Sequence, residues 1–511
     1  MRVSLINGGL HPKDAVGTCV INQARYFMER GHRVRIYLSS VPAQVSAEID
    51  ALTRVVPLKE ILEQRHEHFM LSDLYIYHYG GRYDLVETMR GIERGTVVFN
   101  YHNVTPPELW GTDVGREWLA DGVAGSALAH YADFCLADSP FNKQDLIDRL
   151  GYSPERIYVL PLAVDLAEFT PGVRDPGLVE RYGLHGQRVL VYVGRMAGNK
   201  RIDLLIEALA HVQRQVPDTK LLLVGDDKTN PAFRPIVAFA RARAAELGVG
   251  EDVIWNGRVD DLPAHYRLAD VYVSASLHEG FGVPLIEAMA SGVPVVASRA
   301  GAMPWVLEEA GVLCEPGDAR DLADKVLAVL RDADLSRMLV ERGQARVQAF
   351  SRERYEAGLT QILGDALGHD PAGAEPQPAG LAGQDDQDRA AAEREVPRGP
   401  FAGLLLESLS DAAMAGSDVA LRDYEIRSGL PLVGPLIVWL RRNLTSHLRE
   451  PYLDPIIERQ VTYNRRVAEW LDRATQMLTG GWARQQELEA RVQALEQQVE
   501  QLTRRMEEDQ S

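Results

Sequence analysis

The side chains best suited to chemistry are two glutamates, Glu279 and Glu287, with seven residues between them. The stretch between them contains the turn Gly280-Phe281-Gly282 and then the start of a predicted helix. Glycine at a helix N-terminus leaves backbone N–H groups and the positive end of the helix dipole open to anionic or hydroxylated ligands. A carboxylate can accept two hydrogen bonds from a sugar diol. We therefore expect Glu287 to hold one diol and Glu279 another. The alternative is a surface helix with incidental glutamates.

Two cations, Arg195 and Lys200, lie on the loop that follows a predicted strand at residues 188–193. Positive charges at this spacing could clamp a diphosphate and stabilise its charge as it departs as a leaving group. Solvated loop cations are the alternative. The sequence contains neither a Walker loop nor a G-x-G-x-x-G fingerprint, so ATPase and dehydrogenase activities lose their main support.

The elements that must position these residues alternate between strand and helix. The alternation runs over residues 1–165 and starts again at residue 188, each time with a strand, a glycine and a helix. This pattern is typical of βαβ units and a parallel sheet. It predicts an α/β fold with two facing Rossmann-like domains, at residues 1–165 and 166–366, and a ligand cleft at the carboxyl ends of their strands. The expected strands are 3–6, 34–38, 74–77, 96–101, 188–193, 221–224, 253–255, 271–274 and 293–297.

Composition narrows the function classes. The 511 residues carry a formal charge of -18, which argues against a nucleic-acid-binding protein. The cysteines Cys19, Cys135 and Cys314 form no C-x-x-C pair, as expected in a reducing compartment. Neither a signal peptide nor an apolar run long enough for a membrane span is recognisable. These features predict a cytoplasmic protein.

The C-terminal part has a different composition. Residues 367–400 are rich in proline, glycine, alanine and acidic residues, which predicts a disordered linker. Residues 401–479 continue with helical signals, and arginines beside the apolar stretch 436–440 would suit the inner face of a plasma membrane with anionic lipid. A small helical domain with solvated arginines is the alternative.

Residues 482–511 predict a parallel coiled coil and hence a homodimer. Apolar side chains recur there at spacings of four and three, with leucine at d and valine mostly at a. A single amphipathic helix docked on its own catalytic domain is the alternative. The a and d residues are Leu488, Val492, Leu495, Val499, Leu502 and Met506.

Over residues 1–366 the sequence resembles the family 4 glycosyltransferases, retaining enzymes of the GT-B fold with nucleotide-sugar donors. The segments that carry the resemblance are 278–287, 193–200 and Asn100 to Pro107. It implies that Glu279 lies by the donor sugar, that Glu287 holds the nucleotide ribose, and that Arg195 and Lys200 hold the diphosphate.

The resemblance also implies roles for backbone groups and for a histidine. Backbone groups of Phe281 and Gly282 would contact the sugar and phosphate. His102 would help to position or deprotonate the acceptor hydroxyl, although a lone histidine is more often structural. The N-terminal glycines would let the backbone approach the donor phosphates and the acceptor, with an ordinary βα turn as the alternative; they are Gly8, Gly9 and Gly17.

Some positions depart from the family pattern and weaken any assignment of the exact donor. Trp305 stands where many members have glutamate, and Arg201 stands where glycine is common. Two D-x-D triplets, at 332–334 and 386–388, do not follow predicted strands, so a metal-dependent GT-A transferase is disfavoured. Asp226 and Asp227 could contact the base or a loop.

The resemblance implies a retaining glycosyltransferase of cell-surface polysaccharide synthesis, and no metal or cofactor is expected. It also implies a glycan or a lipid-linked glycan as the acceptor. Other interpretations are a GT-B phosphorylase, a nucleotide-sugar epimerase, or a scaffold protein with a degenerate transferase site.

Overall fold

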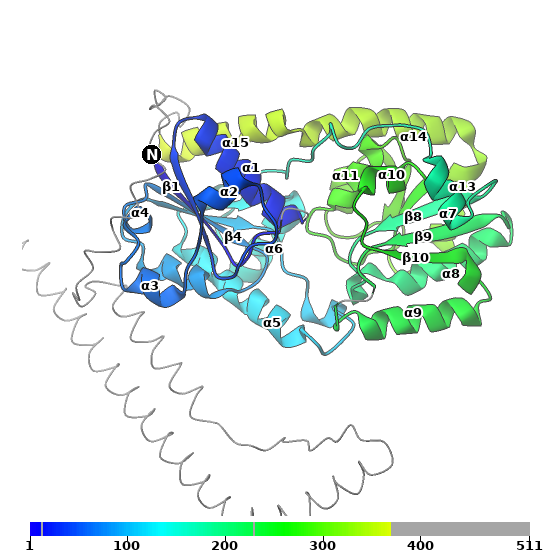
Figure 1. The fold of residues 1–511 in the computed structure, drawn as a ribbon, viewed down its shortest axis with the longest axis horizontal. Helices are drawn as coiled ribbons and strands as arrows, with labels where there is room; N and C mark the ends of the chain where they lie inside the picture. The colour runs from blue at the N-terminus through cyan, green and yellow to red at the C-terminus, as the bar shows by residue number, and fades with distance from the viewer. Residues whose placement is uncertain (12–13, 228–229, 369–511) are drawn as a thin grey trace, which may run out of the picture. The chain divides into compact units, whose positions relative to one another are not determined.

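The computed structural model describes residues 1–11, 14–227 and 230–368, which fold around two parallel sheets (Figure 1). Of these residues, 1–58 and 66–368 belong to one compact unit that holds both sheets. The predicted α/β class with two Rossmann-like sheets is confirmed. The predicted linker beyond residue 368, the helical region 401–479, the coiled coil 482–511 and the triplet 386–388 lie outside the described residues.

The N-terminal sheet contains seven strands among the described residues, in the order β3-β2-β1-β4-β5-β6-β7, and every pair is parallel. The order reverses at β1, so the switch point of this sheet lies between β1 and β4. The strands are β1 (Arg2–Asn7), β2 (Arg33–Leu38), β3 (Thr53–Val55), β4 (Leu74–Tyr79), β5 (Thr96–Tyr101), β6 (Phe134–Ala137) and β7 (Ile157–Val159).

The C-terminal sheet contains six parallel strands among the described residues, in the order β10-β9-β8-β11-β12-β13. Its switch point lies between β8 and β11, where ligands of open α/β sheets bind. The strands are β8 (Arg188–Val193), β9 (Thr219–Val224), β10 (Val253–Gly257), β11 (Val271–Ser274), β12 (Val295–Ser298) and β13 (Gly311–Cys314).

Helices connect the strands and cover both sheets, as parallel strands require. The α-helices are α1 (Ala15–Glu29), α2 (Ala47–Leu52), α3 (Leu58–Leu62), α4 (Glu67–Met70), α5 (Arg116–Gly125), α6 (Pro140–Leu150), α7 (Pro176–Tyr182), α8 (Ile202–Gln213), α9 (Arg234–Glu246), α10 (Leu262–Tyr266), α11 (Val283–Ala290), α12 (Met303–Leu307), α13 (Ala319–Arg331), α14 (Ala333–Arg346) and α15 (Arg352–Leu367). The 3-10 helices are η1 (Asp84–Gly91), η2 (Pro107–Leu109), η3 (Ser126–Tyr131), η4 (Pro154–Arg156), η5 (Gly198–Lys200), η6 (Gly250–Asp252) and η7 (Val347–Phe350).

Several of the predicted strands coincide with observed ones. Those at 96–101, 188–193 and 271–274 match β5, β8 and β11 at both ends. The strand predicted at 293–297 begins at Val295, one residue after Pro294, which has no N–H to give to a ladder. Strands β3, β6, β7 and β13, with three or four residues each, were not predicted.

Strand β4 is fully buried although it contains several side chains with polar groups. All of its residues are buried, including three tyrosines. The hydroxyl of Tyr75 donates to the carbonyl of Phe69 at 2.5 Å, and the hydroxyl of Tyr79 donates to the carbonyl of Gly122 at 2.6 Å. Because each phenol finds a partner, these rings contribute apolar area without leaving a polar group unpaired.

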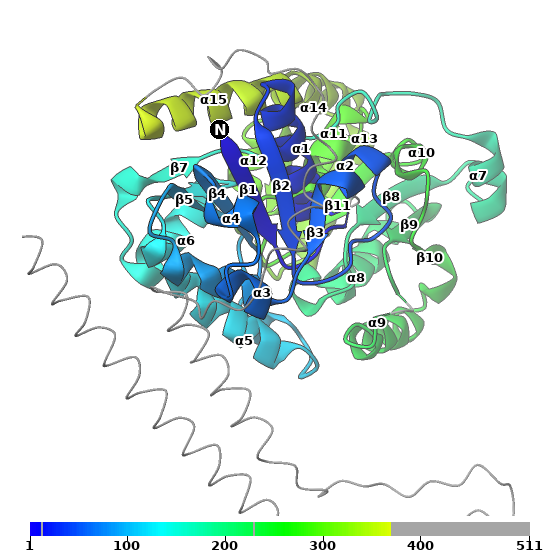
Figure 2. The ribbon, with the colours of Figure 1, turned by 60° about the vertical axis from the view of Figure 1, so that its left-hand side comes forward.

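Helix α15 leaves the C-terminal sheet and packs on α1 of the N-terminal domain, as both views show (Figures 1 and 2). The amide of Gln23 donates to the hydroxyl of Tyr355 at 2.9 Å, and the hydroxyls of Tyr26 and Thr360 lie 2.7 Å apart. Arg30 pairs with Glu356 at 3.1 Å. These contacts join the end of the predicted domain 166–366 to the predicted domain 1–165.

No helix in the described part of the chain is long and apolar enough to cross a bilayer. Asp332 and Asp334, the described D-x-D triplet, lie at the start of α14, where Asp332 caps the helix by accepting from the backbone N–H of Asp334 and Leu335. Helix capping therefore accounts for Asp332 in this triplet.

The contact between α1 and α15 yields a stability prediction. Replacing Tyr355 by Phe removes the acceptor of the buried Gln23 amide, so the variant should lose about 1–3 kcal/mol of unfolding free energy. Urea unfolding followed by circular dichroism measures the loss. Tyr131→Phe is the control, because the Tyr131 residue is 53% exposed. Equal unfolding midpoints for the two variants would contradict the assigned contact.

Candidate donor site

Lys200 and Glu279 meet at the switch point of the C-terminal sheet. Lys200 ends the loop after β8, and Glu279 lies on the loop after the neighbouring strand β11. The Lys200 Nζ and Glu279 Oε1 atoms are 2.5 Å apart, and the two side chains are 9% and 20% exposed. The structure thus joins two predicted site residues in a largely buried ion pair.

Backbone contacts hold the two loops together beneath this pair. The Asn199 side-chain amide donates to the carbonyl of His278 at 3.0 Å, and the N–H of Leu277 donates to the carbonyl of Asn199 at 2.8 Å. The hydroxyl of Ser276 donates to Glu279 Oε1 at 3.1 Å. The Glu279 carboxylate therefore has two donors and one fixed orientation.

The local electrostatics disfavour unpaired charge. Burial lowers the pKa of the Lys200 ammonium and the nearby Arg195 lowers it further, whereas Glu279 opposes both effects. Burial raises the pKa of Tyr192 and Tyr272 far above the usual range, and the Glu279 carboxylate adds to both shifts. The ion pair thus lies against neutral phenols, a setting in which added charge interacts strongly.

Arg195 occupies the same loop as Lys200 but faces outward. Its residue is exposed, and its guanidinium carbon lies 5.7 Å from the ring centroid of Trp110. The hydroxyl of Tyr192 donates to the Arg195 carbonyl at 2.9 Å, which fixes the backbone. One loop therefore presents two positive charges, one buried and one exposed, as a diphosphate clamp would require.

The turn between the two glutamates leads into helix α11. Gly282, with φ +100, precedes the helix, and the Phe281 side chain packs into the core against Phe350 and Trp305. With the Phe281 side chain turned inward, the turn can offer a ligand its backbone groups.

Glu287 lies one turn into α11, as predicted. Its Oε2 atom accepts a hydrogen bond from the hydroxyl of Tyr266 at 2.7 Å. Burial raises the pKa of the Glu287 carboxyl to about 7, although the Tyr266 bond opposes the shift. The carboxyl therefore changes charge near neutral pH.

The N-terminal domain supports the glutamate turn from its other side. The hydroxyl of Ser139, the N-cap of α6, donates to the carbonyl of Gly280 at 2.6 Å. His278 Nε2 and Asn103 Oδ1 are 2.7 Å apart, and Asn103 has φ +70. A Cβ on Gly280 would lie 2.7 Å from the Cβ of Asn103, so only glycine permits this approach.

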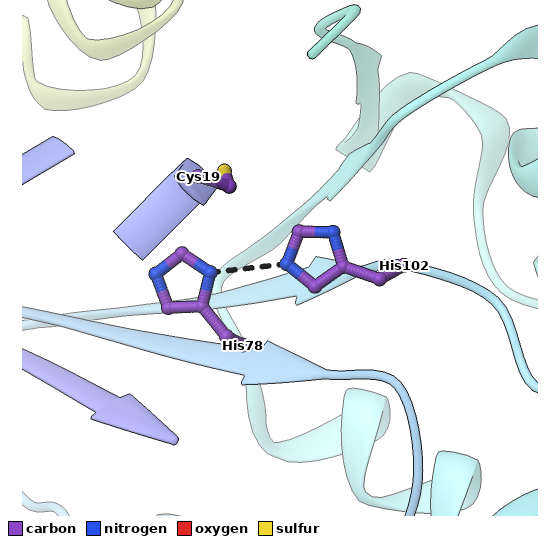
Figure 3. A group of neighbouring side chains, drawn as sticks. All are labelled: Cys19, His78 and His102. Carbon is purple, nitrogen blue, oxygen red and sulfur yellow. Dashed lines mark hydrogen bonds between the residues drawn. The ribbon is translucent and has the colours of Figure 1, made fainter. Parts of the chain in front are cut away.

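His102 lies at the end of β5, and its ring is turned into the protein. Its Nδ1 atom lies 2.9 Å from Asp138 Oδ2, and its Nε2 atom lies 3.0 Å from His78 Nδ1 (Figure 3). The side chain is only 2% exposed. Both ring nitrogens of His102 therefore have hydrogen-bond partners within the N-terminal domain.

Cys19, His78 and His102 each place a possible metal-ligand atom within 4.8 Å of the others (Figure 3). Burial raises the pKa of the Cys19 thiol to about 12 and lowers that of His78 well below its usual value. The amide of Asn100 lies 3.2 Å from His78 Nδ1 and 3.6 Å from Cys19 Sγ. Hydrogen bonds around Asn100 and between the two histidines therefore account for the proximity of these three atoms.

The N-terminal glycines lie where β1 leads into α1. The carbonyl of Gly8 accepts a hydrogen bond from the Ser40 hydroxyl at 2.9 Å, and a Cβ on Gly9 would meet the same hydroxyl. The N–H of Gly17 donates to the side chain of Asp14, the N-cap of α1, at 2.6 Å. The N–H of Gly17 is thus already used in the N-cap of α1. Gly8 and Gly9, in contrast, follow the carboxyl end of β1.

The structure therefore brings the predicted residues Arg195, Lys200 and Glu279 together on two neighbouring loops, with Glu287 on the helix that follows. Several residues that contact these groups were not predicted, most of them distant in sequence from their partners. The Ser139-Pro140 pair after an apolar run is a helix-start signal that could have revealed one of them. The missed residues are His78, Asn103, Trp110, Asp138, Ser139, Tyr192 and Tyr266.

The raised pKa of Glu287 yields a prediction about stability and pH. The folded protein holds this proton up to about pH 7, whereas an unfolded glutamate releases it near 4.5. Stability from the protonated form is thus complete below about pH 4.5 and is lost as the pH rises through 7. Glu287→Gln stays neutral, so at pH 8 it should exceed the wild type by about 1–3 kcal/mol relative to their difference at pH 4.5.

Chemical unfolding of both proteins at pH 4.5 and 8 measures this change. Glu309→Gln is the control, because the Glu309 side chain is 83% exposed and pairs only with a partly exposed arginine. A Glu287→Gln difference that is the same at both pH values would show that the carboxyl is not buried in its charged form.

Two family models match the chain in succession. Residues 16–168 match the model described as Glycosyltransferase Family 4, and residues 187–332 match the model described as Glycosyl transferases group 1. The two matches cover the N-terminal sheet region and the C-terminal region that holds Arg195, Lys200, Glu279 and Glu287.

Curated relatives carry glycosyltransferase and sugar-phosphate synthase names. A mannosylfructose-phosphate synthase of Agrobacterium fabrum is 34% identical over 31% of this chain and 36% of its own. A D-inositol 3-phosphate glycosyltransferase of Salinispora arenicola is 32% identical over 46% of this chain and 55% of its own. The chain thus spans between about a third and just over half of these two relatives.

Solved structures with low sequence identity share the fold. HepE from Anabaena, crystallised with UDP and glucose, gives a TM-score of 0.59 at 20% identity and covers 71% of this chain and 100% of its own. Sucrose-phosphate synthase from Thermosynechococcus elongatus gives 0.56 at 22% identity, over 72% and 99%. With two facing Rossmann-like sheets, both family models in chain order and these structural neighbours, the chain belongs to the family 4 glycosyltransferases of GT-B fold.

Proposed function

We propose that this protein moves a sugar from a nucleotide-sugar donor to a glycan or lipid-linked glycan acceptor, with retention of anomeric configuration. The observation that carries the proposal is the Lys200–Glu279 ion pair at the switch point between β8 and β11, with Arg195 on the same loop. This site combines cations for a diphosphate with a carboxylate for sugar hydroxyls.

The charges at the site suit a departing nucleoside diphosphate. As the glycosidic bond to the diphosphate breaks, negative charge grows on the leaving oxygen, and the ammonium of Lys200 and the guanidinium of Arg195 would stabilise it. Both cations are fixed before the reaction, Lys200 by Glu279 and Arg195 by the contact with Trp110. Preorganised charge of this kind costs no rearrangement during the reaction.

Glu279 and Glu287 would hold the two sugars of the donor. Glu279, beside the ion pair, would accept hydrogen bonds from hydroxyls of the transferred sugar. Glu287, one turn into α11, would accept from the ribose hydroxyls, with backbone groups of Phe281 and Gly282 between them. The neighbour HepE, crystallised with UDP and glucose, supports this class of donor.

The acceptor would enter over the carboxyl ends of β1 and β5. Gly8 and Gly9 end the first strand, and His102, fixed by Asp138, ends the other. A role in surface glycan synthesis gains support from the neighbour WaaG, whose structure is titled as a glycosyltransferase involved in lipopolysaccharide biosynthesis, with a TM-score of 0.54.

The remaining proposals concern location and assembly. Composition supports a cytoplasmic protein, and the arginine-rich region 401–479 supports peripheral contact with the inner face of a plasma membrane. The a/d spacing in 482–511 supports a homodimer.

The diphosphate clamp yields the main test of the proposed function. Lys200→Ala and Arg195→Ala should each lower turnover by about 10²–10³-fold, because each removes a charge that stabilises the leaving group. Thermal shift with UDP-, GDP- and ADP-sugars first identifies the donor that stabilises the wild type, and transfer is then assayed with that donor.

Lys220→Ala is the matched control. Lys220 lies near the amino end of β9, away from the carboxyl ends of the strands where the donor site lies, and it pairs with Asp252 at 3.3 Å. Near-normal turnover in both clamp variants, or an equal loss in the control, would contradict the assignment of the donor site.

Metal independence is a separate prediction. Two positive side chains already face the proposed diphosphate, so transfer should continue in excess EDTA. Initial rates with and without the chelator, and after addition of Mn²⁺, measure this. Complete loss of activity that Mn²⁺ restores would favour a metal-dependent mechanism instead.

A further inference from the structure

A loop of the N-terminal domain reaches the proposed donor loop of the C-terminal domain. Trp110 on this loop is only 6% exposed, and its ring packs edge-on against Phe233, with 5.6 Å between the ring centroids. Phe233 immediately precedes α9, and in Figure 1 the cyan segment before α5 extends toward that helix. The N-terminal domain thus places an aromatic side chain beside the loop that holds Arg195 and Lys200.

The backbone contact between the two loops is unusually close. The N–H of Gly198 donates to the carbonyl of Trp110 at 3.0 Å. A Cβ on Gly111 would lie 2.8 Å from the Cα of Gly198, and a Cβ on Gly198 would lie 2.6 Å from the Cα of Gly111. Only a pair of glycines allows this approach. Gly198 opens the short helix η5, which ends at Lys200, so the contact fixes the turn that carries the lysine.

The ring of Trp110 also faces the second cation. The Arg195 guanidinium carbon lies 5.7 Å from the ring centroid, within the range of a cation–π interaction. The indole N–H donates to the carbonyl of Val114 at 2.9 Å, which holds the ring in its orientation. An exposed arginine has many rotamers, and a fixed aromatic face reduces them before a ligand arrives.

We propose that Trp110 is a positioning residue for the donor diphosphate, acting through Arg195 and through the Gly198–Lys200 turn. The proposal rests on the proposed function, because it takes these two cations as the diphosphate clamp. It assigns to the N-terminal domain a part in binding the donor phosphates. The contribution should be specific to the phosphates, because Trp110 contacts the cation loop and not Glu287.

The alternative is that Trp110 only joins the two domains. A purely structural contact would weaken the binding of every ligand of the donor site alike. A positioning role would weaken the binding of a nucleoside diphosphate and spare the nucleoside. The ratio of the two dissociation constants therefore separates the two roles.

The experiment uses the full chain and whichever of UDP, GDP and ADP stabilises the wild type most. Calorimetry gives the Kd of that diphosphate, and displacement gives the Kd of its nucleoside. Trp110→Ala should weaken diphosphate binding about tenfold and leave nucleoside binding unchanged. Trp110→Phe, which keeps an aromatic face beside Arg195, should lose less.

Two further variants separate the two routes and control for unrelated effects. Gly111→Ala inserts a methyl group against Gly198, at a φ of +82, without changing the indole, so it disturbs the Gly198–Lys200 turn alone and should also weaken diphosphate binding selectively. Trp118→Ala is the matched control, because Trp118 lies on α5 of the same domain and is 53% exposed. It should bind both ligands as the wild type does.

A double variant tests the route of action. If Trp110 acts partly through Arg195, the loss in Trp110→Ala/Arg195→Ala should be smaller than the product of the two single losses. Unchanged diphosphate binding in Trp110→Ala, or equal loss for diphosphate and nucleoside, would overturn the proposal while leaving the proposed function intact. A wild type that binds none of the three diphosphates would overturn the proposed function itself.

Discussion

The ion pair between Lys200 and Glu279 is the contact on which the arrangement of the site depends. Moving two charges out of water is costly, and a buried pair persists only when other hydrogen bonds satisfy it. Here the hydroxyl of Ser276 supplies one such bond, and the Asn199 side chain ties the two loops together. The partners come from loops 79 positions apart in the chain, so they meet only because the sheet order places β8 beside β11. The topology is thus a precondition of the electrostatics.

The turn between the two glutamates depends on the N-terminal domain for its rigidity. A turn that offers backbone groups to a ligand cannot use those groups for its own rigidity, so its rigidity has to come from elsewhere. Ser139 supplies it through the Gly280 carbonyl, and Asn103 supplies it through His278. Asn103 adopts a left-handed backbone, which asparagine tolerates better than most residues, and its side-chain amide donates to Asn142 at 3.0 Å. Residues of the N-terminal domain therefore hold the turn of the C-terminal domain, so the geometry of the site depends on how the two domains are placed.

The sequence predicted what local pattern can encode. Local patterns located β5, β8 and β11 to the residue, and the spacing of Glu279 and Glu287 placed the second glutamate one turn into α11. Strand β6 was not predicted although it is as long as β11, because its sequence Phe-Cys-Leu-Ala contains no β-branched residue, whereas β11 contains two valines. Contacts between distant segments also escaped: His102 looked like an open catalytic group until Asp138 and His78 occupied its two nitrogens. Periodicity predicts which face of an element is buried, but it does not predict which side chains of distant segments contact that face.

Burial disfavours the charged side chain at both ends of the site. Burial lowers the pKa of Lys200 and raises the pKa of Glu287, so at both ends the fold disfavours the charged form. At the Lys200 end a carboxylate offsets that cost, whereas at Glu287 the hydroxyl of Tyr266 offsets it through a hydrogen bond. A ligand with negative charge at the first end and hydrogen-bond donors at the second would relieve both. A nucleoside diphosphate has this polarity, with phosphates at one end and ribose hydroxyls near the other. In the proposed function, part of the stability that the fold gives up at these two side chains would be recovered as affinity for such a ligand.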